Sequence, residues 1–156
     1  MPRLILILDG MTDPRNLGAC LRSANAAGVD AVLLPKRRIA PLSSTVMKVA
    51  QGGCEKLTMV ETGNIARTIK WLREREVWVI GADEAGGSIW ESNVGNHPVA
   101  LVLGDEGKGL RRLTKELCDE MASIPMFGTV ESLNVSVAAG VLLYELRRKT
   151  VYAAHS

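Results

Sequence analysis

Short apolar segments, separated by segments with helical periodicity, constrain the possible fold of this chain more than any other feature. Leu4–Leu8 and Val99–Leu103 are apolar at every position, and residues 31–34 repeat the pattern. A strand without polar positions must be covered on both faces, which is typical of strands in parallel sheets. We therefore predict an α/β fold in which helices cover both faces of a mostly parallel sheet.

The other elements follow from the same patterns and from the positions of Gly, Pro and capping residues. Strands are expected over residues 4–8, 31–34, 57–60, 77–80, 99–103 and 121–124. Helices are expected over residues 17–27, 64–75, 113–117 and 133–148, with a short one between Ser43 or Ser44 and Gly52. With 156 residues and no linker or low-complexity segment, residues 1–156 are expected to form a single domain.

Several classes of protein are excluded by simple sequence features. The apolar runs are too short to span a bilayer, and Asp9 interrupts the N-terminal run before it could serve as a signal peptide. The three cysteines are widely spaced and form no CxxC pair, which indicates reduced thiols in a cytoplasmic protein. Because His97 and His155 are the only histidines, we expect no histidine-rich metal site and no histidine base, and assign no metal.

The loops that follow the strands are the candidate sites, because parallel α/β sheets bind ligands at the carboxyl ends of their strands. After the first strand, Asn16 can cap the next helix, and Arg22 lies six positions further on. Arg22 is either a functional cation or a partner in a structural salt bridge.

After the fifth strand, three glycines within residues 104–109 permit close approach of the backbone to a ligand. This loop is neither a Walker A loop nor a dinucleotide fingerprint, because its spacing and its late place in the chain differ from theirs. A third candidate precedes the last helix, where Ser132, Asn134 and Ser136 form a polar start to an otherwise apolar segment. Such a start can hold a polar ligand, or Ser132 can simply cap the helix.

Positive charge is concentrated in three short clusters. They are Lys36-Arg37-Arg38, Arg111-Arg112 with Lys115, and Arg147-Arg148-Lys149. Clusters of this kind suit an anionic polymer such as a nucleic acid. On charge alone, however, an ordinary solvated surface is the more frequent explanation.

Taken together, the three loops resemble the three motifs of the SpoU (TrmH-type) RNA 2′-O-methyltransferases of the SPOUT superfamily. The motifs here are Asn16-x-Gly18-x-x-x-Arg22, Leu103-Gly104-x-Glu106-Gly107-x-Gly109, and Ile124-Pro125-Met126 followed by Ser132-Leu133-Asn134-Val135-Ser136. The resemblance extends over residues 4–148. Within the family it is greatest to the catalytic domain of the bacterial 23S rRNA guanosine-2′-O-methyltransferases, on the basis of Asp9-Gly10-x-Thr12-Asp13-Pro14, Leu113-Thr114 and residues 132–137.

The resemblance implies a C-terminal deep trefoil knot, a homodimer, and S-adenosyl-L-methionine as cofactor. It implies methyl transfer to a ribose 2′-hydroxyl of RNA, most specifically a guanosine of 23S rRNA, with a tRNA target or a non-catalytic RNA-binding relative as alternatives. The related enzymes carry a small RNA-binding domain before the catalytic one, and this chain is expected to lack it. The implied cofactor-binding residues are Leu103, Gly104, Gly109, Ile124, Met126, Ser132 and Leu133. The implied catalytic residues are Arg22, Asn16, Glu106, Ser132 and Asn134.

The family assigns activation of the hydroxyl to Arg22. Because a guanidinium stays protonated, we expect Arg22 to stabilise the developing alkoxide, with Glu106 or a substrate phosphate as the proton acceptor. Asn16, Ser132 and Asn134 would position Arg22 and the ribose. A nucleotide-cofactor dehydrogenase is the alternative from another class, but residues 9–13 do not supply the GxGxxG that it needs after the first strand.

Overall fold

The computed structural model describes residues 3–42 and 57–152, and they form one parallel sheet between two layers of helices. The strands are β1 (Leu4–Leu8), β2 (Ala31–Pro35), β3 (Met59–Thr62), β4 (Trp78–Ser88), β5 (Val99–Leu103) and β6 (Glu120–Ser123). The helices are α1 (Pro14–Ala26), α3 (Ile65–Glu74), α4 (Arg112–Leu117) and α5 (Val135–Tyr152), with a 3₁₀ turn, η2, at Ile89–Glu91. The short helix predicted after Ser43 or Ser44 lies outside the described residues.

The sheet has the strand order β3-β2-β1-β5-β4-β6, and each strand pairing in the described chain is parallel. β1 and β5 form its centre, in a register that joins Leu4 to Val99 and Leu8 to Leu103. From β1 the chain continues to one edge of the sheet, and it returns to build the other half. The loops after β1 and β5 therefore diverge at a topological switch point, where open α/β sheets bind their ligands.

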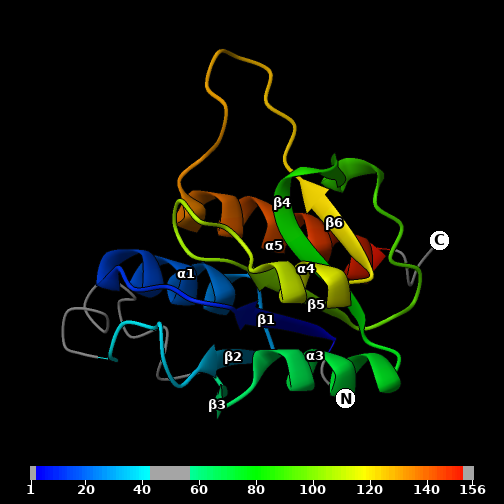
Figure 1. The fold of residues 1–156 in the computed structure, drawn as a ribbon. Coiled ribbons are helices and arrows are strands. Elements are labelled where there is room, and N and C mark those ends of the chain that lie inside the picture. Colours follow the sequence, from blue (N-terminus) through cyan, green and yellow to red (C-terminus); the bar gives the residue numbers. More distant parts are fainter. Residues whose placement is uncertain (1–2, 43–56, 153–156) are drawn as a thin grey trace.

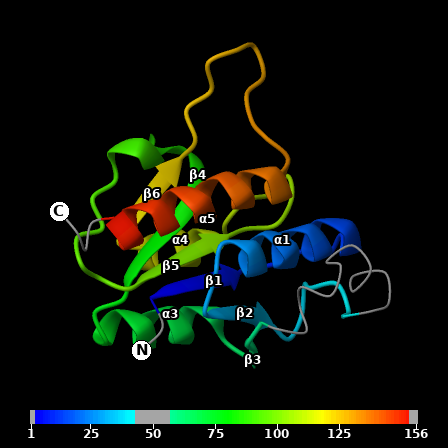
Figure 2. The ribbon, with the colours of Figure 1, turned by 180° about the vertical axis from the view of Figure 1, so that it is seen from behind.

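Alternating residues of each central strand face the two helical layers. Leu4, Leu6 and Leu8 belong to the core cluster that includes α1 and α5, whereas Ile5 and Ile7 belong to the cluster with α3. Figure 1 shows α3 and α4 on one face of the sheet, and Figure 2 shows α1 and α5 side by side on the other. The predicted fold class, with helices on both faces of a parallel sheet, is confirmed.

Two helix starts differ from the sequence-based predictions. α1 begins at Pro14, three residues earlier than expected, because Asp13 is its cap: Asp13 Oδ1 accepts from the backbone N–H of Arg15 (2.8 Å) and of Asn16 (3.2 Å). Asn16 is thus not the cap, and its side chain remains available for other contacts. α5 begins at Val135, and Asn134 Oδ1 accepts from the N–H of Ser136 at 2.9 Å, so the alternative in which Ser132 caps this helix is wrong.

The strands at the sheet edges also differ from prediction. β4 extends to Ser88 instead of ending at residue 80, and its pairing with β6 shifts register between Ala82 and Gly87. A Cβ on Gly86 would lie 2.5 Å from the backbone carbon of Met121, so glycine permits the close approach of the two strands there. Gly86 and Gly87 thus continue a bent strand.

Candidate active site

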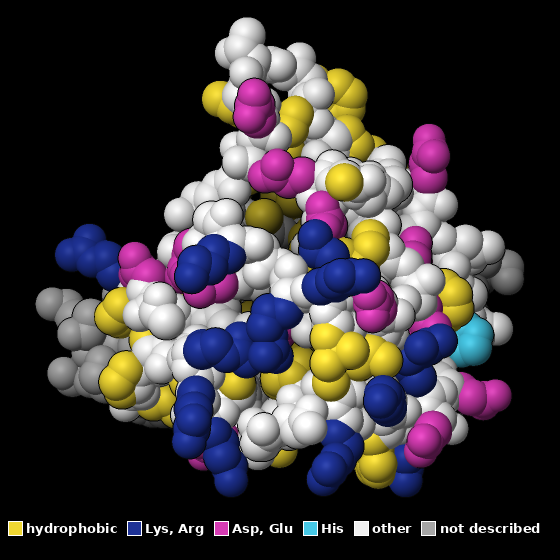
Figure 3. Space-filling model, in the orientation of Figure 1, with side chains coloured by type: hydrophobic (Ala, Val, Ile, Leu, Met, Phe, Trp, Pro, Cys, Tyr) yellow, Lys and Arg dark blue, Asp and Glu magenta, His cyan; other side chains and the backbone are white. Residues whose placement is uncertain are grey.

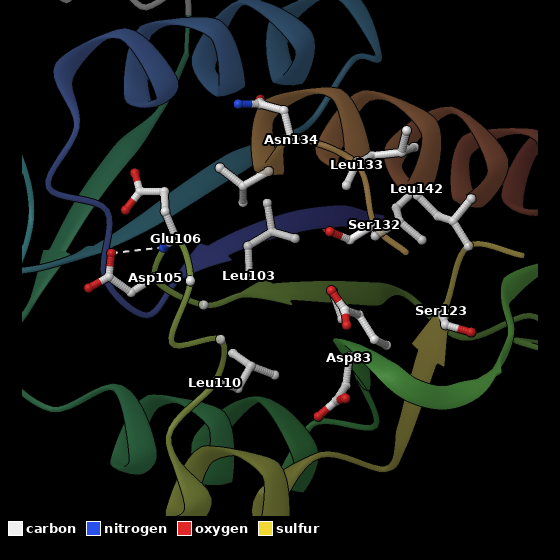
Figure 4. Close-up of a pocket in the computed structure, with 18 of the residues that line it drawn as sticks. Asp83, Leu103, Asp105, Glu106, Leu110, Ser123, Ser132, Leu133, Asn134 and Leu142 are labelled. Atoms are coloured by element: carbon white, nitrogen blue, oxygen red, sulfur yellow. Dashed lines mark hydrogen bonds between the residues drawn. The ribbon is translucent and has the colours of Figure 1, made fainter. Parts of the chain in front are cut away.

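A cavity of about 770 Å³ opens at the carboxyl ends of β5 and β6, beside the middle of β4. Three segments supply most of its wall: residues 103–110 after β5, residues 122–126 at the end of β6, and residues 131–135 leading into α5. Figure 4 shows Ser132 and Leu133 between α5 and the strand ends, with Asp83 on the side away from Asn134. The predicted site residues that line the cavity are Asn16, Leu103, Gly104, Glu106, Gly109, Ile124, Met126, Ser132, Leu133 and Asn134.

The loop after β5 folds back tightly on itself. Asp105 N donates to Gly109 O at 3.2 Å, and Gly109 N donates to Asp105 O at 2.9 Å. Gly109 adopts φ +69°, and a Cβ on Gly104 would lie only 2.2 Å from the carbonyl carbon of Gly109. Glycine is therefore required at position 104, since any side chain there would push the loop open.

Three segments that are distant in sequence meet in one chain of hydrogen bonds at the cavity. Asn134 Nδ2 donates to Asn16 Oδ1 at 3.4 Å, and Asn16 Nδ2 donates to Glu106 Oε1 at 3.3 Å. These two hydrogen bonds thus connect the start of α5, the first turn of α1 and the loop after β5. Because Asp13 caps α1, the amide of Asn16 can orient the carboxylate of Glu106.

Glu106 has the most informative acid–base properties in the cavity. Partial burial, together with the neighbouring Asp105 carboxyl, raises the pKa of Glu106 above its ordinary value, although the hydrogen bond from Asn16 partly opposes this shift. A carboxylate with a raised pKa is a better proton acceptor near neutral pH. Behind it, burial raises the pKa of the Cys20 thiol to about 12, so Cys20 stays protonated and packs as an apolar residue.

Arg22 is the one predicted site residue that does not line the cavity. Its side chain is exposed on α1 and forms no ion pair with another described residue, so the structural salt bridge is not formed within this part of the chain. Six residues beyond Asn16, it lies about 9 Å further along the helix and about 240° around its axis. Arg22 therefore lies on a different side of α1 from Asn16, outside the lining of the cavity.

Carboxylates outnumber cations around the cavity. Its lining includes five carboxylates, Asp83, Glu84, Asp105, Glu106 and Glu131, and two cations, Lys108 and Lys115. Lys115 Nζ lies 2.8 Å from Asp83 Oδ2, and this hydrogen bond lowers the pKa of Asp83. The cavity therefore favours a ligand that carries positive charge.

Sequence reasoning missed the part of the cavity formed by β4. Asp83 and Glu84 follow the residue at which that strand was predicted to end, so they were never considered as candidates. Among the described residues, no group of three or more His, Cys, Asp and Glu side chains is placed to hold a metal ion. No helix in the described ranges is both long enough and apolar enough to cross a membrane.

A family model, the SpoU rRNA Methylase family, matches residues 3–144. This chain belongs to the SpoU rRNA methylase family. The match includes the three segments that form the cavity wall and the hydrogen-bonded chain between them.

Members of the SpoU family are similar to this chain in both sequence and structure. The 23S rRNA (guanosine-2′-O-)-methyltransferase RlmB of Ralstonia nicotianae is 54% identical over 155 residues, which are 98% of this chain and 62% of that protein. The SpoU methyltransferase AviRb from Streptomyces viridochromogenes, solved with AdoMet, superposes with a TM-score of 0.86 at 27% identity, over 97% of this chain and 62% of AviRb. This chain thus spans about three fifths of the length of each.

A further solved structure matches this chain along nearly its whole length. It is described as giving structural insights into 2-OH methylation of C/U34 on tRNA, and it has a TM-score of 0.82 at 27% identity. The match covers 97% of this chain and 98% of that one.

Proposed function

We propose that this chain transfers a methyl group from S-adenosyl-L-methionine to a ribose 2′-hydroxyl of RNA, and that the target is a guanosine of 23S ribosomal RNA. The observation that carries the proposal is the hydrogen-bonded chain from Asn134 through Asn16 to Glu106 at the rim of the cavity. The name of the Ralstonia relative, at 54% identity, supports the choice of guanosine and of 23S rRNA. With 23S rRNA as its target, the proposed place of action is the cytoplasm.

The cavity fits this cofactor better than it fits a dinucleotide. Its volume of about 770 Å³ lies within the usual range for small-molecule sites, about 300–1,000 Å³. The excess of carboxylates suits a cofactor with a sulfonium and an ammonium group, and would repel the pyrophosphate of NAD. When bound, the cofactor supplies an electrophilic methyl group. The residues proposed to hold it are Leu103, Gly104, Gly109, Ile124, Met126, Ser132 and Leu133.

The side chains at the rim would align the ribose hydroxyl and remove its proton. Alignment of the reacting oxygen accounts for much of the rate gain in such transfers. Ser132 and Asn134 would orient the ribose, and Asn16 would fix the carboxylate of Glu106. Glu106, with its raised pKa, would accept the hydroxyl proton.

A homodimer would explain how Arg22 takes part. Val137, Tyr144 and Val151 recur at intervals of seven residues on α5, and they are 52%, 54% and 41% exposed. Such an apolar stripe suits a partner helix. Because α1 packs beside α5, a second subunit on this stripe would bring Arg22 of one subunit close to the cavity of the other. There its guanidinium would stabilise the developing alkoxide.

The trefoil knot belongs to the same proposal. Family membership supports it, as does the return of the chain after β6 through residues 124–134 to the cavity wall before α5 begins. A knot would hold these residues beside the loop that follows β5.

Methylation of a tRNA is the second candidate. The structure described as concerned with C/U34 of tRNA matches this chain along 98% of its own length. A protein of about this length is therefore associated with methylation of tRNA, which favours tRNA as the alternative substrate.

Ligand-dependent thermal stability tests the cofactor assignment. The melting temperature of the purified protein is compared without ligand, with S-adenosyl-L-methionine, with its demethylated product, and with NAD. We expect stabilisation by the first two only, since a ligand stabilises the state that binds it. Stabilisation by NAD alone would favour the dehydrogenase alternative.

A further inference from the structure

We propose that Arg38 and Arg111, held side by side by the buried carboxylate of Asp9, bind one phosphate of the RNA strand next to the cavity. The inference rests on the proposed function in taking RNA as the substrate. It assigns a specific site to two of the three basic clusters, which are separated by more than seventy positions in the sequence.

Asp9 is the centre of this arrangement. It follows β1 directly, and its side chain is fully buried. Arg111 donates two hydrogen bonds to the carboxylate, from Nη2 to Oδ1 at 2.6 Å and from Nε to Oδ2 at 3.2 Å. Thr114 Oγ1, also buried, donates to Oδ2 at 2.7 Å.

Arg38 contacts the same aspartate, and its Nη2 lies near the carboxylate oxygen that Arg111 Nη2 also contacts. Its Nη1 donates to the backbone carbonyl of Asp9 at 2.7 Å, and its Nη2 lies 3.6 Å from Asp9 Oδ1. The backbone of Arg38 adopts φ +61°, which is costly for a residue with a side chain. Hydrogen bonds hold it there: Met11 N donates to Arg38 O, and Ala40 N donates to Met11 O, both at 2.8 Å.

The two guanidinium groups keep capacity for an anion after binding Asp9. The side chains of Arg38 and Arg111 are 41% and 52% exposed, and a guanidinium has five N–H donors, more than these contacts use. One carboxylate is shared between two cations, so the group has a net positive charge. Two preorganised forks of this kind match the paired oxygens of a phosphate.

Other arginines of the basic clusters are engaged differently. In the third cluster, Arg147 donates to the carbonyls of Ala27 and Gly28, and Arg148 pairs with Glu145. Arg112, the neighbour of Arg111, is 93% exposed, and within residues 3–42 and 57–152 it pairs only with Glu116, one helical turn away. Arg112 therefore provides a matched control, with the same charge but no buried anchor.

The arginine pair lies directly beside the candidate active site. A Cβ on Gly10 would be 3.4 Å from Arg38 Nη1 and 3.6 Å from the Cβ of Asp105, which lines the cavity. Asp9 N also donates to the carbonyl of Leu103 at 2.8 Å, so the aspartate is tied to the strand that carries the cavity loop. A phosphate at this position would belong to the strand that presents its ribose to the cavity.

The surrounding surface favours a polymer over a free nucleotide. Lys36, Arg37, Lys108 and Arg112 are exposed in the loops and helix that flank the pair. Figure 3 shows Lys and Arg side chains gathered over α4 and around the ends of β1 and β2. These cations extend beyond the reach of a single phosphate, as a track along an RNA backbone requires.

The test measures binding of an unmodified in vitro transcript of 23S rRNA by filter binding over a series of salt concentrations. We expect Arg38→Gln and Arg111→Gln each to weaken binding about tenfold or more, and Arg112→Gln to weaken it no more than about threefold. The double variant should show a slope of log K against log salt that is shallower by about 1. Equal effects of Arg111→Gln and Arg112→Gln would overturn the proposal.

Asp9→Asn separates geometry from simple charge. The substitution makes the surface more positive, so non-specific attraction predicts tighter RNA binding. A site that depends on the buried anchor predicts weaker binding, and Arg38→Lys and Arg111→Lys, which keep the charge but lose the fork, should weaken it too. If Asp9→Asn fails to fold, the two lysine variants decide: wild-type RNA affinity in both would overturn the proposal.

Calorimetry with S-adenosyl-L-methionine distinguishes failure of this site from failure of the proposed function. All variants that fold should bind the cofactor as the wild type does, because none of the substituted residues lines the cavity. If the wild-type protein binds the cofactor and methylates the transcript, but the variants keep the RNA affinity of the wild type, only the phosphate site is overturned. Wild-type protein that binds neither cofactor nor transcript would overturn both.

Discussion

Replacement of Gly104 by alanine should weaken cofactor binding through a clash with backbone atoms alone. The added Cβ would lie 2.2 Å from Gly109 C, 2.3 Å from Gly109 O and 2.4 Å from Leu110 N. All three are backbone atoms, so no side-chain rotation can relieve the clash. To restore an ordinary contact of about 3.5 Å, the loop would have to move by roughly 1.3 Å.

That movement can be converted into expected losses. It breaks the two hydrogen bonds between Asp105 and Gly109, at about 1 kcal/mol each, so we expect a loss of about 2 kcal/mol in the free energy of unfolding. For a chain of this length, the melting temperature should fall by roughly 4–8 °C. The cavity wall moves with the loop, and loss of one or two cofactor hydrogen bonds should weaken binding by about 10- to 100-fold.

Calorimetry with S-adenosyl-L-methionine and a thermal melt measure both effects. Gly128→Ala is the matched control, because a Cβ there meets nothing within 4 Å and Gly128 has no positive φ. We expect it to bind cofactor within about twofold of the wild type, with a change in stability of less than about 0.5 kcal/mol. A Gly104→Ala protein with wild-type melting temperature and cofactor affinity would refute the reasoning.

Three further predictions concern the chemistry and the assembly. Arg22→Ala should abolish methyl transfer and leave cofactor affinity within a few fold, because Arg22 does not line the cavity. Single-turnover assays measure the rate of methyl transfer and calorimetry measures cofactor affinity; a near wild-type rate would exclude a catalytic role for Arg22. Glu106→Gln should lower the rate by about 10²–10⁴-fold and remove the acid limb of the pH profile. In the wild type that rate should rise as pH increases through the raised pKa of Glu106, since only the carboxylate accepts a proton; an unchanged acid limb in the variant would point to another acceptor. Sedimentation should show a dimer at micromolar concentration and a monomer after Val137→Glu with Tyr144→Glu, whereas a monomeric wild type would contradict the proposed assembly.

Local sequence patterns predicted the central part of the fold well. β1 and β5 match the predicted residues because each is a continuous apolar run that must be buried on both faces. The loop after β5 and the segment after β6 were also correctly chosen as cavity walls, since parallel strands place their carboxyl ends at one edge, whereas the segment chosen after β1 contributes only Asn16 to the described lining. The knot, the homodimer and the roles of the individual site residues stay predictions.

Features set by distant contacts could not be predicted in this way. β4 continues through Gly86 because β6 approaches it closely there, and nothing local in the sequence reports that approach. Asp9 binds Arg111 and Thr114, which follow it by 102 and 105 positions in the sequence. From the sequence alone, the arginines around Asp9 therefore resemble separate surface charges. Arg22 lies outside the cavity because of how α1 packs on the sheet and on α5, which periodicity along one helix cannot show.

The most direct test of the account is to identify the methylated nucleotide. Wild-type protein is incubated with isotopically labelled S-adenosyl-L-methionine and an equimolar mixture of unmodified 23S rRNA and tRNA, and the digested nucleosides are resolved by mass spectrometry. The account predicts label in 2′-O-methylguanosine from 23S rRNA, with none in the reaction that lacks protein. Three results, obtained with protein that binds the cofactor, would contradict the account. They are label in a methylated base, label in 2′-O-methylcytidine or 2′-O-methyluridine from tRNA, and no label in any nucleoside.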